Sequence, residues 1–351
     1  MAHSPQRPPS TWPRLALGGL ALAVAFWLDL LSGSAPITAG DALGIALGRL
    51  PADADLARIL LDFRLPRVLT ALAAGMALPV AGALMQALFR NPLASPSELG
   101  VSAGASMGVA LLLLGVQGGG LGFLFHSVGA SWGMAGAASL GAMAVMAVIS
   151  ALAARVRQSA TLLIAGLLIS QLIAAGIGLL QWASGAESLR AFTFWGLGSL
   201  AGVDPTRLRL LLPLTALGLT ASMALAKPLD GLALGEEGAL SLGIRLKPLR
   251  LVLLFVASLL TAVITAFCGP IAFIALMVPH LARGLMRRTS HLIVLPACML
   301  IGGALLLLCD AATQMPGGGG VLPINALTAL IGAPVILAVV LRREKPGRSA
   351  P

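Results

Sequence analysis

Apolar stretches, each ended by a short segment rich in charges, glycine or proline, alternate along the whole chain. A helix needs about 20 apolar residues to cross the roughly 30 Å hydrocarbon core of a bilayer, and many of the stretches approach this length. The pattern therefore predicts an all-α, polytopic membrane protein with about ten transmembrane helices. The predicted spans are residues 15–31, 67–88, a third that follows Ser97, a fourth that ends at Arg155, 160–182, 208–226, 251–267, 271–285, 292–309 and 321–341.

The two ends of the chain are polar. A proline-rich tail, residues 1–13, precedes the first span, and residues 346–351 form a second tail, so residues 14–345 make up one transmembrane domain. A cleaved signal peptide is the competing interpretation of the first apolar stretch, with Arg14 as its basic flank and Ser32–Ala35 as its cleavage site. Because a proline follows that site directly, a retained span is favoured.

The longest polar interruption in the second half of the chain runs from Lys227 to Arg250 and carries charges of both signs. Within it, Leu234–Leu242 contains good helix formers with glycines near both ends, which predicts a short helix outside the membrane. Such a short helix is unstable in water by itself, so a docked partner is expected. An ordinary solvated loop is the alternative.

The third span carries Gly100, Gly104 and Gly108, one small residue in each helical turn. This spacing lets a neighbouring helix approach closely and indicates packing rather than chemistry. Ser97 is expected to cap the same helix, with Glu98 in its first turn.

Two further polar segments have different expected structures. Residues 33–66 are predicted to be a mixed-charge loop. Residues 187–204 are predicted to be a partly helical loop at the membrane surface, where Trp195 is a typical interfacial side chain.

Composition and charge agree with a membrane protein. Hydrophobic residues make up 58% of the chain and charged residues 10%, whereas a soluble chain has about 25% charged residues. The net charge of +10 would suggest nucleic acid as a partner for a soluble protein, but here it follows the positive-inside rule. Ten spans place sixteen of the 23 lysines and arginines on one side, together with both termini and residues 227–250. This side is predicted to be cytoplasmic, in the cell inner (plasma) membrane.

The sequence lacks the motifs of common catalytic centres. A Walker loop, an HExxH pair and a CxxC pair are missing, and the four histidines are scattered. Cys268, Cys298 and Cys309 lie in or beside apolar stretches, as small core residues do. We therefore expect a transport subunit rather than an enzyme, with no catalytic residue, no metal site and no cofactor in this chain.

Ionisable residues are rare inside the predicted spans. Asp29 and Asp310 lie near span ends, where we expect their carboxyl groups to reach water at little cost. A carrier driven by protons or sodium ions usually needs a buried carboxylate at the middle of the membrane, and none is evident here. A secondary, ion-coupled transporter of a small solute remains the alternative function.

A series of short motifs runs in order along almost the whole chain. The first half contains RLPR (64–67), Gly75, GALMQ (82–86), RNPLASP (90–96) and LGV (99–101), and the second half contains LGE (234–236), Ala239, Leu242-Gly243, GPIAFI (269–274), VPH (278–280), Arg283, Asp310 and GAP (332–334). These motifs resemble the permease family of type II ABC importers for iron–siderophores, haem and cobalamin, the FecCD-like permeases.

The resemblance implies the type II ABC importer permease fold and a homodimer of ten-helix subunits in lipid. Two ATP-binding cassette ATPase subunits, which hold the ATP and magnesium, would dock from the cytoplasm. A periplasmic or lipoprotein substrate-binding protein would dock from outside. The imported substrate would be a metal chelate such as an iron–siderophore, haem or cobalamin.

The resemblance also implies roles for particular residues. Residues 227–250 would form the loop that couples the permease to the ATPase. Arg64 and Arg67 would receive carboxylates of the binding protein. The implied coupling residues are Leu234, Gly235, Glu236, Glu237, Ala239, Leu242 and Gly243, and the implied cytoplasmic gate is Asn91, Pro92, Leu93, Ser159 and Thr161.

The chain departs from the family pattern in one region. Gln314 stands where the family usually has an arginine four residues after Asp310. Val321–Asn325 replaces the usual Glu-Leu-Pro-Val-Gly before the last span. The outer rim near the tenth span is therefore altered, with consequences expected for docking of the binding protein there.

Overall fold

The computed structural model describes residues 11–33, 35, 37–47, 54–115, 130–156, 158–314 and 322–343. Within these residues every regular element is a helix, so the all-α prediction is confirmed. The elements are α1 (Trp12–Leu31), α2 (Ala39–Ala46), α3 (Ala54–Arg58), η1 (Ile59–Arg64), α4 (Leu65–Phe89), α5 (Val101–Leu113), α7 (Ala130–Arg155), α8 (Ser159–Ala183), α9 (Ala186–Gly196), α10 (Pro205–Ala224), α11 (Ala226–Ala233), α12 (Glu236–Ser241), α13 (Leu246–Cys268), α14 (Ile274–Met286), α15 (His291–Thr313) and α16 (Ile324–Arg343).

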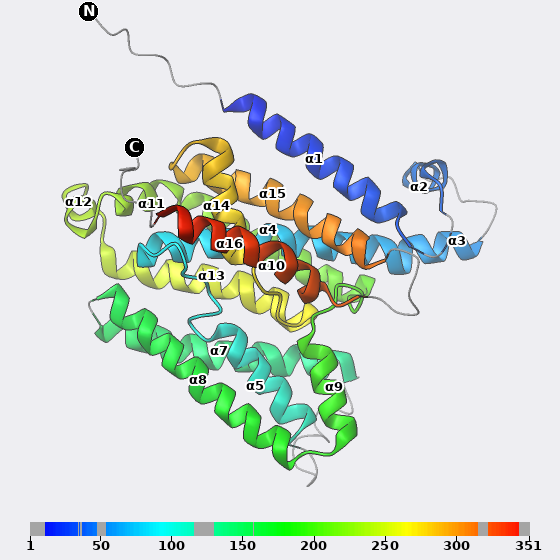
Figure 1. The fold of residues 1–351 in the computed structure, drawn as a ribbon, viewed down its shortest axis with the longest axis horizontal. Helices are drawn as coiled ribbons and strands as arrows, with labels where there is room; N and C mark the ends of the chain where they lie inside the picture. Colours follow the sequence, from blue (N-terminus) through cyan, green and yellow to red (C-terminus); the bar gives the residue numbers. More distant parts are fainter. Residues whose placement is uncertain are drawn as a thin grey trace, which may run out of the picture.

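Helix α4 lies at the centre of the bundle. It packs against α15, α13, α14 and α10, and most of its residues are buried. Helix α13 contacts α4 on one side and α7 on the other, and beyond it α5 packs against α7, α8 and α9 (Figure 1). The first helix, α1, packs along α15 as a retained span would. Two helix groups therefore share α13 as their common wall.

The described helices account for the ten predicted spans. Six helices are long and apolar enough to cross a membrane, and α10 with α11 makes a seventh span that is bent by 48°. Three shorter apolar helices, α5, α14 and α16, correspond to the remaining predicted spans. The multi-pass architecture is thus confirmed for the described part of the chain, although several spans are shorter or more bent than a straight crossing.

Close approach of α5 and α7 depends on small residues. A Cβ atom added at Gly108 would overlap the backbone carbonyl of Ala137, and one added at Gly104 would lie 2.5 Å from the carbonyl oxygen of Gly141. The predicted packing role of these glycines is confirmed. The prediction that Ser97 caps this helix is wrong. Helix α5 follows Gly100, whose backbone is in the left-handed conformation, and no side chain caps its N-terminus.

The segment before α4 is more helical than expected. Residues 55–89 form one continuous helix that includes the π-helical turn η1, whereas residues 33–66 were predicted to be a loop. That prediction is wrong for residues 54–66, and also for residues 39–46, which form the short helix α2. In the other predicted surface loop, α9 is present and Phe192 is buried, as expected for a partly helical segment lying on the bundle.

The ends of the described chain lie together. The start of α1, the end of α16 and the short helix α12 are found at one end of the bundle, whereas α2, α3 and α9 lie at the opposite end (Figure 1). Arg14 at the start of α1 donates to the carbonyl oxygen of Met286 at the end of α14, 2.9 Å away. This arrangement agrees with the predicted alternation of sides. Residues 1–10, Val321 and the tail after Arg343 lie outside the described residues.

Candidate functional site

The segment around α12 is the predicted coupling segment. It projects at one end of the bundle beside α11 (Figure 1). Gly235 and Gly243, on either side of α12, have φ angles of 100° and 77°, a region that strongly favours glycine. The predicted short helix is therefore present, and glycine is required at both of its ends.

The side chains around α12 divide into supporting and exposed groups. Ala239 is fully buried, so it packs the helix onto the bundle and is not available to a partner. Leu234, Leu240 and Leu242 are 70%, 57% and 60% exposed. Apolar side chains this exposed at a membrane-protein end are typical of a docking surface. Leu240, which the sequence analysis did not single out, belongs to this set.

Arg250 ties α12 to the turn between α7 and α8. Its Nη1 atom donates to the carbonyl oxygen of Val156 over 3.0 Å, and its Nη2 atom lies 3.4 Å from Oε1 of Glu236. The Glu236 side chain is about half exposed, whereas the Arg250 side chain is 11% exposed. Glu236 is thus partly engaged inside the chain, and Glu237 is the more available carboxylate.

Asp230 in α11 ties the same segment to the start of α15. Its carboxylate accepts hydrogen bonds from the Ser290 hydroxyl, the His291 backbone N–H and the His291 ring nitrogen Nδ1, each over 2.7 Å. These bonds satisfy orphan groups at a helix N-terminus. Polar contacts therefore join the segment of α11 and α12 to both helix groups.

The predicted gate residues occupy two turns at this end of the bundle. The side-chain carbonyl of Asn91 accepts from the N–H of Leu93 over 2.9 Å, which forms an Asx-turn. Thr161 in the first turn of α8 is exposed, and Ser159 is the first residue of that helix. Further along α8, a Cβ atom added at Gly166 would lie 2.9 Å from the Cα atom of Leu99, so α8 packs closely on the chain that follows the first turn.

Helix α14 holds the first of these turns through side chains to which sequence reasoning assigned no role. His280 Nε2 lies 2.8 Å from the carbonyl oxygen of Pro92. Gln86 near the end of α4 accepts from Nη1 of Arg283 over 2.7 Å and donates to the carbonyl of Leu276 over 3.2 Å. All three polar side chains belong to the motifs that carry the family resemblance. Their place in these motifs was the sequence signal that could have identified them as functional residues.

At the opposite end, Arg64 is directed inward. It is 7% exposed, and its guanidinium donates to the backbone carbonyls of Leu30, Leu31 and Ala35. Simple snorkelling to water does not describe it. Docking of a binding protein on Arg64 stays a prediction, and it would require the guanidinium to exchange these carbonyls for a carboxylate.

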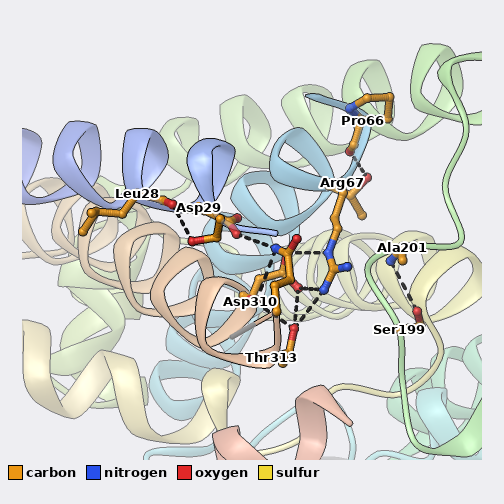
Figure 2. Close-up of polar contacts among 11 residues, drawn as sticks. Leu28, Asp29, Pro66, Arg67, Ser199, Ala201, Asp310 and Thr313 are labelled. Atoms are coloured by element: carbon orange, nitrogen blue, oxygen red, sulfur yellow. Dashed lines mark hydrogen bonds and ion pairs between the residues drawn. The ribbon is translucent and has the colours of Figure 1, made fainter. Parts of the chain in front are cut away.

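Arg67 forms a two-pronged ion pair with Asp310. Its Nε and Nη2 atoms lie 2.7 Å and 2.8 Å from Oδ2 and Oδ1 of Asp310, and Nη2 also donates to Thr313 over 2.8 Å (Figure 2). Asp29 and Asp310 are each 1% exposed. The expectation that their carboxyl groups reach water is therefore wrong. Docking on Arg67 also stays a prediction, since its guanidinium already has partners within the chain.

The altered rim is built into the fold through Asn325. Its Oδ1 accepts from the N–H of Ala272 over 3.0 Å, and its Nδ2 donates to the carbonyl of Pro270 over 2.7 Å. The departure from the family pattern thus fastens the start of α16 to the turn between α13 and α14. Arg64, Arg67, Arg207 and Gln314 contribute to a cavity of about 310 Å³.

Metal chemistry finds no support among the described residues, since they contain no group of three or more histidine, cysteine, aspartate or glutamate side chains that could hold an ion. The three cysteines are free and buried. What the molecule presents is a helical membrane bundle with an anchored, partly exposed short helix at one end and a charged cluster at the other. These features define a polytopic helical membrane protein with a candidate docking surface at one end.

The chain belongs to the FecCD transport family, whose model matches residues 21–342. It is 35% identical to the hemin transport system permease protein HmuU of Yersinia pestis over 339 residues, which covers 95% of this chain and 97% of that protein. It is also 35% identical to the vitamin B12 import system permease protein BtuC of Klebsiella pneumoniae, covering 99% of this chain and 98% of that one.

A solved structure confirms the fold. The chain is similar to a metal-chelate type ABC transporter in an inward-facing conformation, with a TM-score of 0.81 and 28% sequence identity. The likeness covers 94% of this chain and 99% of the other. The fold is therefore that of the type II ABC importer permeases, as the motifs predicted.

Proposed function

We propose that this chain is the membrane-spanning permease of an ATP-driven importer of a metal chelate such as haem, cobalamin or an iron–siderophore. Two copies would enclose the translocation pathway, two ATPase subunits would bind the end that carries α12, and a binding protein would deliver substrate to the other end. Support comes from the family membership and from relatives named as hemin and vitamin B12 permeases. This chain supplies the pathway and the coupling, whereas ATP and magnesium belong to the ATPase.

The observation that carries the proposal is the construction of the α12 segment. Its exposed leucines face outward, while Arg250 and Asp230 join it to the α7–α8 turn and to α15. A movement of a docked ATPase would pull on both contacts together. Helix α14 packs against α15, and from α14 the bonds of Arg283 and His280 reach Gln86 and the predicted gate turn at Pro92. Closure of the ATPase would thereby change the inner opening of the pathway.

Uptake into proteoliposomes tests this function. The permease, reconstituted with its ATPase and binding protein, should import a chelate when ATP is present at the ATPase side. Haem, cobalamin and ferric siderophores are the substrates to compare. Vesicles without ATP, and vesicles that have a proton or sodium gradient but lack the ATPase, should not import. Gradient-driven uptake by the permease alone would establish the ion-coupled transporter instead.

The orientation in the membrane is a separate prediction. After Cys268, Cys298 and Cys309 are replaced, a cysteine at Ser241, which is exposed in α12, should react with an impermeant maleimide only in opened spheroplasts. A cysteine at Thr193, which is exposed in α9 at the opposite end, is the matched control and should react in intact spheroplasts. The reverse labelling pattern would show that α12 faces outward.

A further inference from the structure

Two buried carboxyl groups lie beside a single guanidinium group at the end of the bundle opposite α12. Asp29 of α1 and Asp310 of α15 are each 1% exposed, and the Asp29 carboxyl interacts electrostatically with that of Asp310. Arg67 is taken up by its two bonds to Asp310 and its bond to Thr313 (Figure 2). If both acids were ionised, the cluster would carry an uncompensated negative charge in a buried place.

The hydrogen bonds around Asp29 also indicate that this carboxyl group has too few partners to be ionised. Gln314 Nε2 donates to Oδ1 of Asp29 over 3.0 Å and lies 3.2 Å from Oδ2 of Asp310. The other oxygen of Asp29, Oδ2, is buried and has no hydrogen-bond partner among the described residues. An ionised carboxylate accepts at both oxygens, so an orphaned one is costly. A carboxylic acid carries no net charge and needs fewer donors, and the Asp310 carboxyl beside it is the neighbouring acceptor for its hydroxyl group.

We propose that Asp29 is held as a neutral carboxylic acid, so that the cluster of Asp29, Arg67, Asp310 and Gln314 is a binding site for one proton. Burying an unpaired carboxylate costs far more free energy than protonating it. Two carboxyl groups that share a site resolve the repulsion by keeping one proton between them. This inference concerns the state of the chain itself and holds whichever substrate is carried.

A bound metal cation fits the cluster less well than a proton. The Arg67 guanidinium lies at the centre of the cluster and repels any further cation. Cys309 of α15, Cys268 of α13 and Arg64 of η1 lie nearby, and Arg64 is occupied by the backbone carbonyls of Leu30 and Leu31. Asp62, Asp204 and Arg207 line the same cavity as Arg67 and Gln314. Among the described residues, no set of three ligand side chains surrounds the two acids. A proton needs only one oxygen lone pair.

The site sits where α1 meets α15, and this gives the proton a structural effect. With Asp29 neutral, one amide group of Gln314 can bridge the two acids and hold the ends of the two helices together. Loss of the proton would place two like charges on either side of that amide. The contact between α1 and α15 at this end is therefore expected to weaken in alkaline solution.

Infrared spectroscopy of the purified full chain tests the protonation directly. The wild-type protein at neutral pH should show the carbonyl stretch of a protonated carboxylic acid, and the Asp29→Asn variant should lack it. Asp62→Asn, whose acid is 52% exposed, is the control and should leave the band in place. A wild-type protein without the band would overturn the proposal, as would a band that survives in Asp29→Asn and disappears in Asp310→Asn.

Unfolding at different pH values gives a second readout. At neutral pH the unfolded chain has released this proton and the native chain holds it, so raising the pH by one unit should favour unfolding of wild type about tenfold more than that of Asp29→Asn. The asparagine variant should be the more stable protein, since asparagine copies the shape of the neutral acid. Equal pH slopes, or a stabilisation of wild type by sodium ions that the variant lacks, would show an ionised Asp29.

Discussion

Replacing Arg67 with alanine should destabilise the folded protein by about 3–5 kcal/mol, the range expected when one partner of a buried ion pair is removed. The side chains of Arg67 and Asp310 are 13% and 2% exposed, with 2.7 Å between Nε and Oδ2. Without the guanidinium, the Asp310 carboxylate stays buried and loses its counter-charge. Reversible unfolding of the purified permease in mixed micelles measures this loss.

An exposed ion pair in the same chain supplies the control. Arg58 and Asp62 lie 3.7 Å apart with side chains that are 76% and 52% exposed, so Arg58→Ala should change the stability by less than about 1 kcal/mol. Replacing both buried partners, as Arg67→Met with Asp310→Leu, should recover much of the lost stability because it leaves no unpaired charge. Equal losses from Arg58→Ala and Arg67→Ala would contradict the buried pair.

Replacing Leu240 and Leu242 with alanine should weaken binding of the ATPase subunits by roughly a hundredfold or more. Each leucine contributes about 1.5–3 kcal/mol when it passes from water into an apolar pocket, and each 1.4 kcal/mol corresponds to a factor of about ten in affinity. Both side chains are more than half exposed in the chain alone, so the substitution leaves the packing of the permease intact. Co-purification and titration with the ATPase measure the effect.

Leucines at the other end of the bundle test whether position decides this result. Leu43 and Leu61 are 51% and 42% exposed in α2 and η1, and alanine at both should leave ATPase binding unchanged. Glu237→Lys tests the charge of the segment more cleanly than Glu236→Lys, because Glu236 also contacts Arg250. Normal ATPase binding by the double leucine variant, in a well-folded permease, would remove α12 from the docking surface.

Local patterns predicted the elements whose causes are local. Apolar length predicted the spans, and the small-residue spacing predicted that another helix packs closely on Gly104 and Gly108; the structure shows this helix to be α7. The glycines on either side of α12 marked a helix that must begin and end abruptly, and both have positive φ angles. In each case the signal lay within a few turns of the chain, whereas the identity of the packing partner did not.

Long-range contacts explain what the sequence analysis missed. Residues 55–64 were expected to be a loop because of their charges, but Arg64 is buried against backbone carbonyls at the end of α1 and just after it, some thirty residues earlier. Asp29 and Asp310 were placed in water because each lies near a helix end. Their burial depends on Arg67 and Gln314, and Arg67 and Asp310 are 243 residues apart in the chain.

At the candidate site, too, local sequence predicted some features and long-range contacts determined the others. The resemblance indicated which residues surround α12, but it carried no information on exposure, and the structure buries Ala239 while it exposes Leu240. His280, Gln86 and Arg283 were visible as motif residues without a role. Their bonds between α14, α4 and the turn at Pro92 depend on helices that meet only in the folded bundle.

The contact between α1 and α15 joins helices that are synthesised at very different times. Asp29 is made early and its hydrogen-bond donor Gln314 is 285 residues further along the chain. At a synthesis rate of about 5–20 residues per second, the ribosome needs roughly 15–60 s to supply that partner. During this interval the first helix resides in the membrane with its acid unmatched, and its position near the helix end keeps the acid within reach of the aqueous boundary. The contact between α1 and α15 can therefore form only after almost the whole chain has been made, and a chain that stops before α15 lacks the partner of this acid.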